Sequence, residues 1–155
     1  MKPLRTLGRS ALLLAACALW GAPAQAFHLT DIDGNRQHLE ALRGKWVVLN
    51  VWATWCAPCI HEMPDLEALA RARRDVAVLG LAADGDNPRK LRQYAQALHV
   101  TYPIVAGSGE LLKTFGVNAY PTTFVYDPAG SLVMTKLGQV TRAELERRLG
   151  APAGN

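Results

Sequence analysis

The chain has 155 residues, half of them hydrophobic, and carries 17 basic against 13 acidic side chains. This length supports one domain with a substantial core and argues against a second domain. Three of the basic residues fall within the first 26 positions, which contain no acidic residue, so the rest of the chain is nearly neutral. The overall basicity therefore belongs to the N-terminal segment, and a nucleic-acid-binding surface is excluded.

Residues 1–26 have the pattern of an export signal. A basic start precedes an apolar stretch, and Ala24-Gln25-Ala26 supplies the small residues of a cleavage site, so a domain of residues 27–155 is expected. Two alternatives stay open. The apolar stretch could be an uncleaved anchor, although it is about half the length that spans a bilayer. Leu14-Ala15-Ala16-Cys17 resembles a lipobox, in which Cys17 would carry a lipid.

The remaining chain predicts alternating strands and helices. A turn-rich segment at 31–35 between two short extended segments predicts a hairpin. The apolar run 46–52 predicts a strand, and hydrophobic residues at spacings of three and four predict a helix over about 57–73. Further predicted elements are a buried strand at 76–82, a helix at 88–98, an extended segment at 100–105, a short helix at 110–115, strands at 117–126 and 132–137, and a helix at 141–149. This order predicts an α/β sandwich around a mixed sheet.

Two cysteines lie where the first long strand meets its helix. Cys56 and Cys59 are separated by two residues, and Pro58 fits the first helical turn, where no NH is needed. A bridge across so short a loop adds little stability, so reactivity explains the pair better. A helix N-terminus favours the thiolate of Cys56, which makes it the predicted nucleophile. Cys59 is then the resolving thiol that releases a bound partner.

Glu62 lies one helical turn after Cys59 and is a candidate proton acceptor for that thiol. A desolvated carboxylate there would titrate high, but an ordinary exposed glutamate is the alternative, and spacing alone does not separate the two. A zinc site would need a second pair of ligands, which the chain lacks, so no metal and no bound cofactor are expected. His28 and His38 are expected at the surface rather than as ligands.

These motifs together resemble the thioredoxin superfamily. The resemblance is carried by Trp55-Cys56-Ala57-Pro58-Cys59 with its preceding strand, by Glu62 and Pro64, and by Tyr120-Pro121-Thr122-Thr123 far along the chain. The fuller pattern is similar to the exported branch that includes TlpA, ResA and the cytochrome c maturation thioredoxins of the DsbE and CcmG kind. The match covers residues 27 to about 149, which is nearly all of the predicted domain.

The resemblance implies a thioredoxin-like three-layer sandwich with an N-terminal β-hairpin and an inserted βα unit within residues 80–108. It also implies a cis-proline at Pro121, packed opposite the cysteines. Trp55, Pro58, Tyr120 and Pro121 would form the substrate-binding surface, with the backbone of Tyr120 pairing with an extended substrate. An ordinary proline at the start of a strand is the alternative for Pro121.

One departure from the cytoplasmic thioredoxins is informative. Asn50 stands where they carry a buried aspartate, and because an amide cannot take a proton, this favours Glu62 in that role. The resemblance implies a monomeric periplasmic reductase of disulfides in exported proteins, supplied with electrons by a membrane donor of the DsbD or CcdA kind. Cytochrome c maturation or copper-site assembly proteins are the expected clients. A DsbA-like oxidase and a metal-binding assembly factor are the alternatives.

Overall fold

The computed structural model of the protein describes residues 27–152, so the predicted export signal and Cys17 lie outside the described residues. Within this range no helix combines the length and the apolar character needed to cross a bilayer. The elements in chain order are β1 (His28–Thr30), β2 (Arg36–His38), the 3-10 helix η1 (Leu39–Leu42), β3 (Trp46–Trp52), α1 (Ala57–Ala72), β4 (Val76–Ala82), α2 (Pro88–Ala97), β5 (Ile104–Ala106), α3 (Gly109–Thr114), β6 (Thr122–Tyr126), β7 (Leu132–Leu137) and α4 (Arg142–Leu149).

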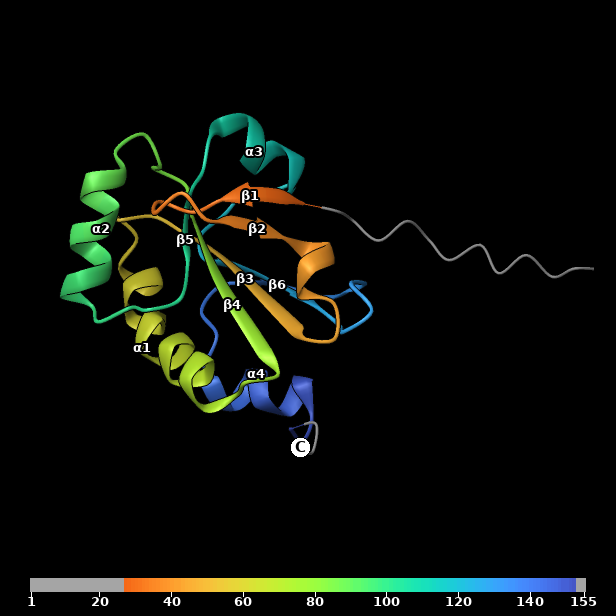
Figure 1. The fold of residues 1–155 in the computed structure, drawn as a ribbon. Helices are drawn as coiled ribbons and strands as arrows, with labels where there is room; N and C mark the ends of the chain where they lie inside the picture. The colour runs from red at the N-terminus through yellow and green to blue at the C-terminus, as the bar shows by residue number, and fades with distance from the viewer. Residues whose placement is uncertain (1–26, 153–155) are drawn as a thin grey trace, which may run out of the picture.

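A five-stranded mixed sheet forms the middle layer, with the strand order β5-β4-β3-β6-β7. β3, β4 and β5 run parallel, whereas β6 pairs antiparallel with both β3 and β7. β1 and β2 form a separate antiparallel hairpin. Figure 1 shows α1 and α2 on one side of the sheet and the hairpin on the other. The predicted thioredoxin-like sandwich with a mixed sheet and an N-terminal hairpin is therefore confirmed.

The central strand β3 packs on both faces. Val48 and Trp52 belong to the core beneath α1, α2 and α4, whereas Val47, Leu49 and Val51 belong to the core beneath α3 and the hairpin. This division follows from the alternation of side chains along a strand. A strand buried on both faces needs a largely apolar sequence. Residues 46–52 have such a sequence, in which Asn50 is the one polar side chain.

The strand predicted over 117–126 is shorter than expected, because β6 begins only at Thr122. Pro121 stands immediately before it in a cis peptide bond with Tyr120. Proline has no NH to donate to a ladder and therefore marks the edge of the paired region. The cis bond itself agrees with the sequence expectation for Pro121.

The end of α1 holds a buried cation that the sequence did not single out. Arg73 follows the helix and is only 5% exposed. Its Nε and Nη2 atoms donate to the two carboxylate oxygens of Asp75, each at 2.7 Å, and its Nη1 donates to the carbonyl of Gly150 at 2.9 Å. Arg73 thus joins the end of α1 to the end of α4, and the bidentate pairing explains why its charge is tolerated there.

Candidate active site

The two cysteines lie at the start of α1, just beyond the end of β3. They form a disulfide with a Cα–Cα distance of 5.3 Å. Cys56 is the N-cap residue of α1, and its sulfur accepts a hydrogen bond from the backbone NH of Cys59 at 3.3 Å. Pro58 lies in the first turn and is exposed. Because free NH groups and the helix dipole converge at this position, a thiolate on Cys56 would be stabilised in the reduced protein.

The two thiol positions differ in their access to solvent. Cys56 retains a small exposed fraction of 4%, whereas Cys59 has none. Cys56 is therefore the more accessible residue of the pair. The order of reaction of the two thiols, with Cys56 first and Cys59 second, stays a prediction.

Glu62 is buried behind the cysteines, with 1% of its surface exposed. Its Oε1 accepts from the side-chain amide of Asn50 at 2.7 Å, and its Oε2 accepts from the backbone NH of Val140 at 2.8 Å. Burial raises the pKa of this carboxyl, and it outweighs the opposing effects of the two hydrogen bonds and of the Lys136 charge. The sequence left two alternatives for Glu62, a desolvated carboxylate and an ordinary exposed one. The structure has the desolvated one.

Asn50, on β3, connects Glu62 on α1 to strand β6. Its amide Nδ2 also donates to Thr123 Oγ1 at 3.1 Å, and Asn50 pairs with Thr123 in the β3–β6 ladder. A carboxylate at position 50 would stand against Glu62 and repel its charge, whereas the amide donates to it. Asn50 therefore donates a hydrogen bond to Glu62, in addition to being unable to take a proton.

We expect Asn50→Ala to lower the free energy of unfolding by about 1–3 kcal/mol, because Glu62 and Thr123 each lose a buried donor. Urea denaturation of the oxidised protein measures this change. Asn118 is exposed, and Asn118→Ala should change the free energy of unfolding by less than about 0.5 kcal/mol. Equal effects of the two substitutions would show that the buried amide does not support Glu62.

Three buried side-chain atoms of the described residues have no hydrogen-bond partner: Asn50 Oδ1, Trp52 Nε1 and Tyr102 Oη. Gly80 lies opposite Asn50 in the β3–β4 register, and a Cβ built on it would stand 3.1 Å from Trp52 Nε1 and 3.2 Å from Tyr102 Cε2. Burial raises the pKa of Tyr102, and the charges of two glutamates, Glu62 among them, raise it further. Trp52 and Tyr102 thus come together over Gly80, and the hydroxyl of Tyr102 lies within electrostatic reach of Glu62.

Two aromatic residues from distant parts of the chain meet beside the disulfide. Trp55 is 68% exposed, and its ring packs edge-on against Tyr120 with centroids 5.5 Å apart. Tyr120 precedes the buried Pro121, whose carbonyl accepts from the NH of Gly138 at 2.9 Å. An exposed tryptophan beside a reactive pair offers apolar contact area to a protein substrate.

Asp84 fixes the backbone just before the cysteines, a contact that the sequence did not reveal. Its carboxylate accepts from the backbone NH of Thr54 at 3.1 Å and also from the Thr54 hydroxyl. Burial would raise the pKa of Asp84, but these hydrogen bonds and the Lys90 ammonium, 3.6 Å away, lower it overall. The loop after β4 thereby holds the segment that presents Trp55 and Cys56.

Comparisons with known proteins agree with this geometry. A model of the AhpC/TSA family matches residues 20–135. The thiol-disulfide oxidoreductase ResA of Geobacillus kaustophilus is 35% identical over 131 residues, which cover 83% of this chain and 75% of that protein.

Solved structures also resemble the protein. A thiol:disulfide interchange protein of the thioredoxin family from Chlorobium tepidum has a TM-score of 0.73 and 27% identity, covering 82% of this chain and 92% of that chain. The pneumococcal exposed lipoprotein thioredoxin from Streptococcus pneumoniae has a TM-score of 0.70 and 30% identity, covering 80% and 97%. The disulfide at the start of α1 and these matches lead to one conclusion: the chain belongs to the AhpC/TSA family and is a thioredoxin-like thiol-disulfide oxidoreductase.

Proposed function

We propose that the protein reduces disulfides of exported proteins, with Cys56 as the attacking thiol and Cys59 as the resolving thiol. The observation that carries this proposal is the position of Cys56 as N-cap of α1, where its sulfur receives the NH of Cys59. A thiolate is the reactive form of cysteine, and this position stabilises it. Cys59, fully buried one turn further along, is shielded from the substrate.

The proposed cycle starts from the reduced dithiol. The Cys56 thiolate attacks one sulfur of the substrate disulfide, forms a mixed disulfide and releases the other substrate sulfur as a thiolate, which takes up a proton. The Cys59 thiolate then attacks the Cys56 sulfur and expels the second substrate thiolate. Two electrons pass to the substrate, and the protein is left with the Cys56–Cys59 disulfide that the structure contains.

Glu62 is the proposed proton acceptor for Cys59 in the second step. Cys59 must lose its proton before it can attack, and Glu62 follows it by three residues on the same helix. The raised pKa of Glu62 brings the carboxyl closer to the pKa of a thiol, which favours exchange of a proton between the two groups.

The proposed substrate surface consists of Trp55, Pro58, Tyr120 and Pro121. Trp55 and Pro58 are exposed on the cysteine side, and Trp55 contacts Tyr120 from the other side. An extended substrate segment would pair with the backbone of Tyr120, a form of recognition that requires no particular side-chain sequence.

The proposed location is the periplasm, reached through the export signal at residues 1–26, with a lipid on Cys17 as the alternative mode of attachment. The pneumococcal relative is named as an exposed lipoprotein, which supports export. A reductase in an oxidising compartment must itself be reduced, so we propose a membrane donor of the DsbD or CcdA kind. Cytochrome c maturation or copper-site assembly proteins are the proposed clients, and the protein is proposed to act as a monomer.

The direction of electron flow is tested by the reduction potential of the Cys56–Cys59 pair, measured at equilibrium against glutathione. We expect a value close to that of thioredoxin, about −270 mV, because reductases have low potentials. A value near that of DsbA, about −120 mV, would overturn the reductase assignment and establish an oxidase.

A further inference from the structure

The N-terminal hairpin brings two histidines into contact outside the candidate active site. His28 lies directly opposite His38, and their Nδ1 atoms are 2.7 Å apart. The neighbouring pair carries a backbone hydrogen bond from the NH of Leu39 to the carbonyl of Phe27. Hydrogen-bonded and non-hydrogen-bonded pairs alternate along an antiparallel ladder, so His28 and His38 form a non-hydrogen-bonded pair. Facing side chains lie closest in pairs of this type. Strand pairing thus brings the two imidazoles together, and a hydrogen bond between their Nδ1 atoms holds them at this separation.

The hairpin is anchored through its other face. Phe27 and Leu29 are buried, and the ring of Phe27 packs edge-on against Tyr126 with centroids 5.8 Å apart. His28 is exposed and His38 half-buried, and their rings meet at 63° with centroids 4.7 Å apart. Because the backbone is already held, little further ordering is needed for both imidazoles to take one common ligand.

The separation fits two ligands at adjacent corners of a square. Two nitrogens, each about 2.0 Å from one metal ion and at a right angle to each other, lie about 2.8 Å apart, whereas a tetrahedral ion would hold them about 3.3 Å apart. Square nitrogen sites are typical of Cu(II), which also binds most tightly among the divalent first-row metals. We propose that His28 and His38 bind one Cu(II) ion through their Nδ1 atoms.

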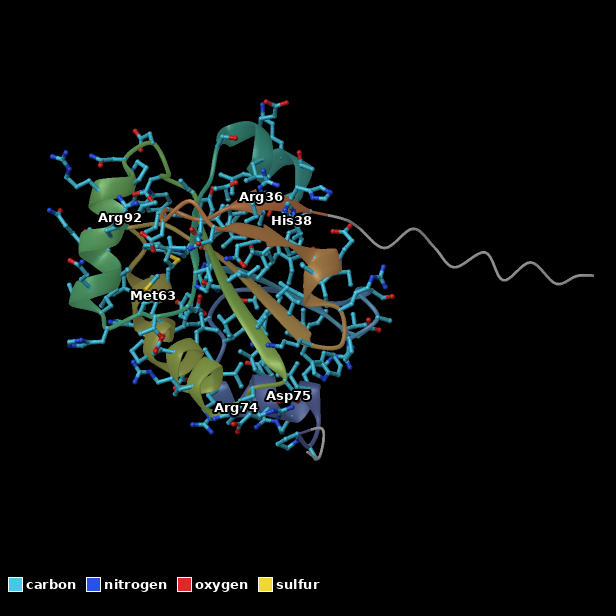
Figure 2. All side chains as sticks on the ribbon, viewed as in Figure 1. Arg36, His38, Met63, Arg74, Asp75 and Arg92 are labelled. Atoms are coloured by element: carbon cyan, nitrogen blue, oxygen red, sulfur yellow. A yellow bond between two sulfur atoms is a disulfide. The ribbon has the colours of Figure 1, made fainter. Side chains whose placement is uncertain are left out.

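Such a site would be open to exchange. Between residues 27 and 152 no group of three or more His, Cys, Asp or Glu side chains is placed to hold a metal, so water would fill the remaining positions. Arg36 lies two residues before His38 on β2, and its charge opposes a cation. Both residues are labelled in Figure 2. The affinity would therefore rest on the two nitrogens, and an open site of this kind suits transient binding rather than a structural ion.

The test is a Cu(II) titration of untagged protein at slightly alkaline pH, because metal binding releases protons and is therefore favoured as the pH rises. The Cys56–Cys59 disulfide is kept oxidised and Cys17 is changed to serine, so that no thiol competes for copper. We expect one equivalent of Cu(II), with an electron paramagnetic resonance spectrum that shows coupling to two imidazole nitrogens. Failure to bind one equivalent would overturn the proposal.

Four matched variants locate the ion. His28→Gln and His38→Gln should each weaken Cu(II) binding about tenfold or more, because each removes one of two ligands. His61 and His99 are exposed on α1 and after α2, and His61→Gln and His99→Gln should leave the affinity unchanged. Wild-type affinity in both hairpin variants, or an equal loss in the two controls, would overturn the proposal. Circular dichroism of each variant shows whether the hairpin variants are folded, and binding lost only together with the fold would also count against it.

Discussion

Replacing Cys59 with alanine should stop turnover after half a cycle and leave substrate proteins attached to Cys56 through a disulfide. The Cys56 thiolate can still attack, but among residues 27–152 no second thiol remains to resolve the mixed disulfide. Catalytic reduction should fall on the order of 10³-fold or more, as expected when a reacting group is lost. Non-reducing electrophoresis of acid-quenched cells measures the adducts, and mass spectrometry identifies the attached proteins.

The matched control for this experiment is Cys56→Ala. It retains Cys59 but removes the sulfur at the N-cap position, so turnover should be lost and no adduct should form. Adducts that form through Cys59 in this variant, in amounts similar to those of Cys59→Ala, would contradict the assignment of attacking and resolving thiols. The double variant reports adducts that involve neither cysteine.

Replacing Glu62 with glutamine should slow release of the substrate about 10²-fold, because general base catalysis contributes at least about that much when the base is positioned. The first step, attack by Cys56, should change far less. Rapid mixing with a fluorescent disulfide peptide separates the two rates, and each is measured as a function of pH. The inflection caused by Glu62 should disappear from the profile of the second step, and an unchanged profile would contradict a proton-accepting role.

Glu62→Gln should also change how the free energy of unfolding depends on pH. The pKa of Glu62 is raised above its ordinary value of 4.5, so the folded protein keeps this proton at pH values where the unfolded chain has lost it. The stability that this group contributes is complete below that ordinary value and falls as the pH rises through the folded pKa. Urea denaturation over a pH series should show this decline in the wild type and not in Glu62→Gln. A decline of equal size in both proteins would assign it to other groups.

Much of the site follows from local sequence, because its key residues lie within one strand and the helix after it. The positions of Cys56, Cys59 and Glu62 depend on the junction of β3 with α1, and both elements have strong periodic patterns. The contact between Trp55 and Tyr120 spans 65 positions, and no local pattern joins the two. Family resemblance implied that both belong to one substrate-binding surface, but not that their rings touch.

The contacts that sequence reasoning missed depend on groups that leave no pattern. Val140 supports Glu62 through its backbone NH, which every residue other than proline possesses. Asp84 follows β4, and its bond to Thr54 arises only when the ends of β3 and β4 are brought together by parallel pairing. Arg73 likewise pairs with the carbonyl of Gly150, and no side-chain type signals a carbonyl partner.

The close packing over Gly80 limits how far this protein can be shortened. A Cβ at Gly80 would stand 2.7 Å from Ile104 Cδ1, so the strand, Trp52 and the segment around Tyr102 are in close contact there. Deleting the inserted segment that contains α2 and β5 would uncover the Trp52 indole and leave β4 as an unprotected sheet edge. Exposed, hydrophobic edge strands promote aggregation. A minimal version of the domain would thus need to keep α1, with its cysteine pair, and would also need a new element to cover the edge of β4.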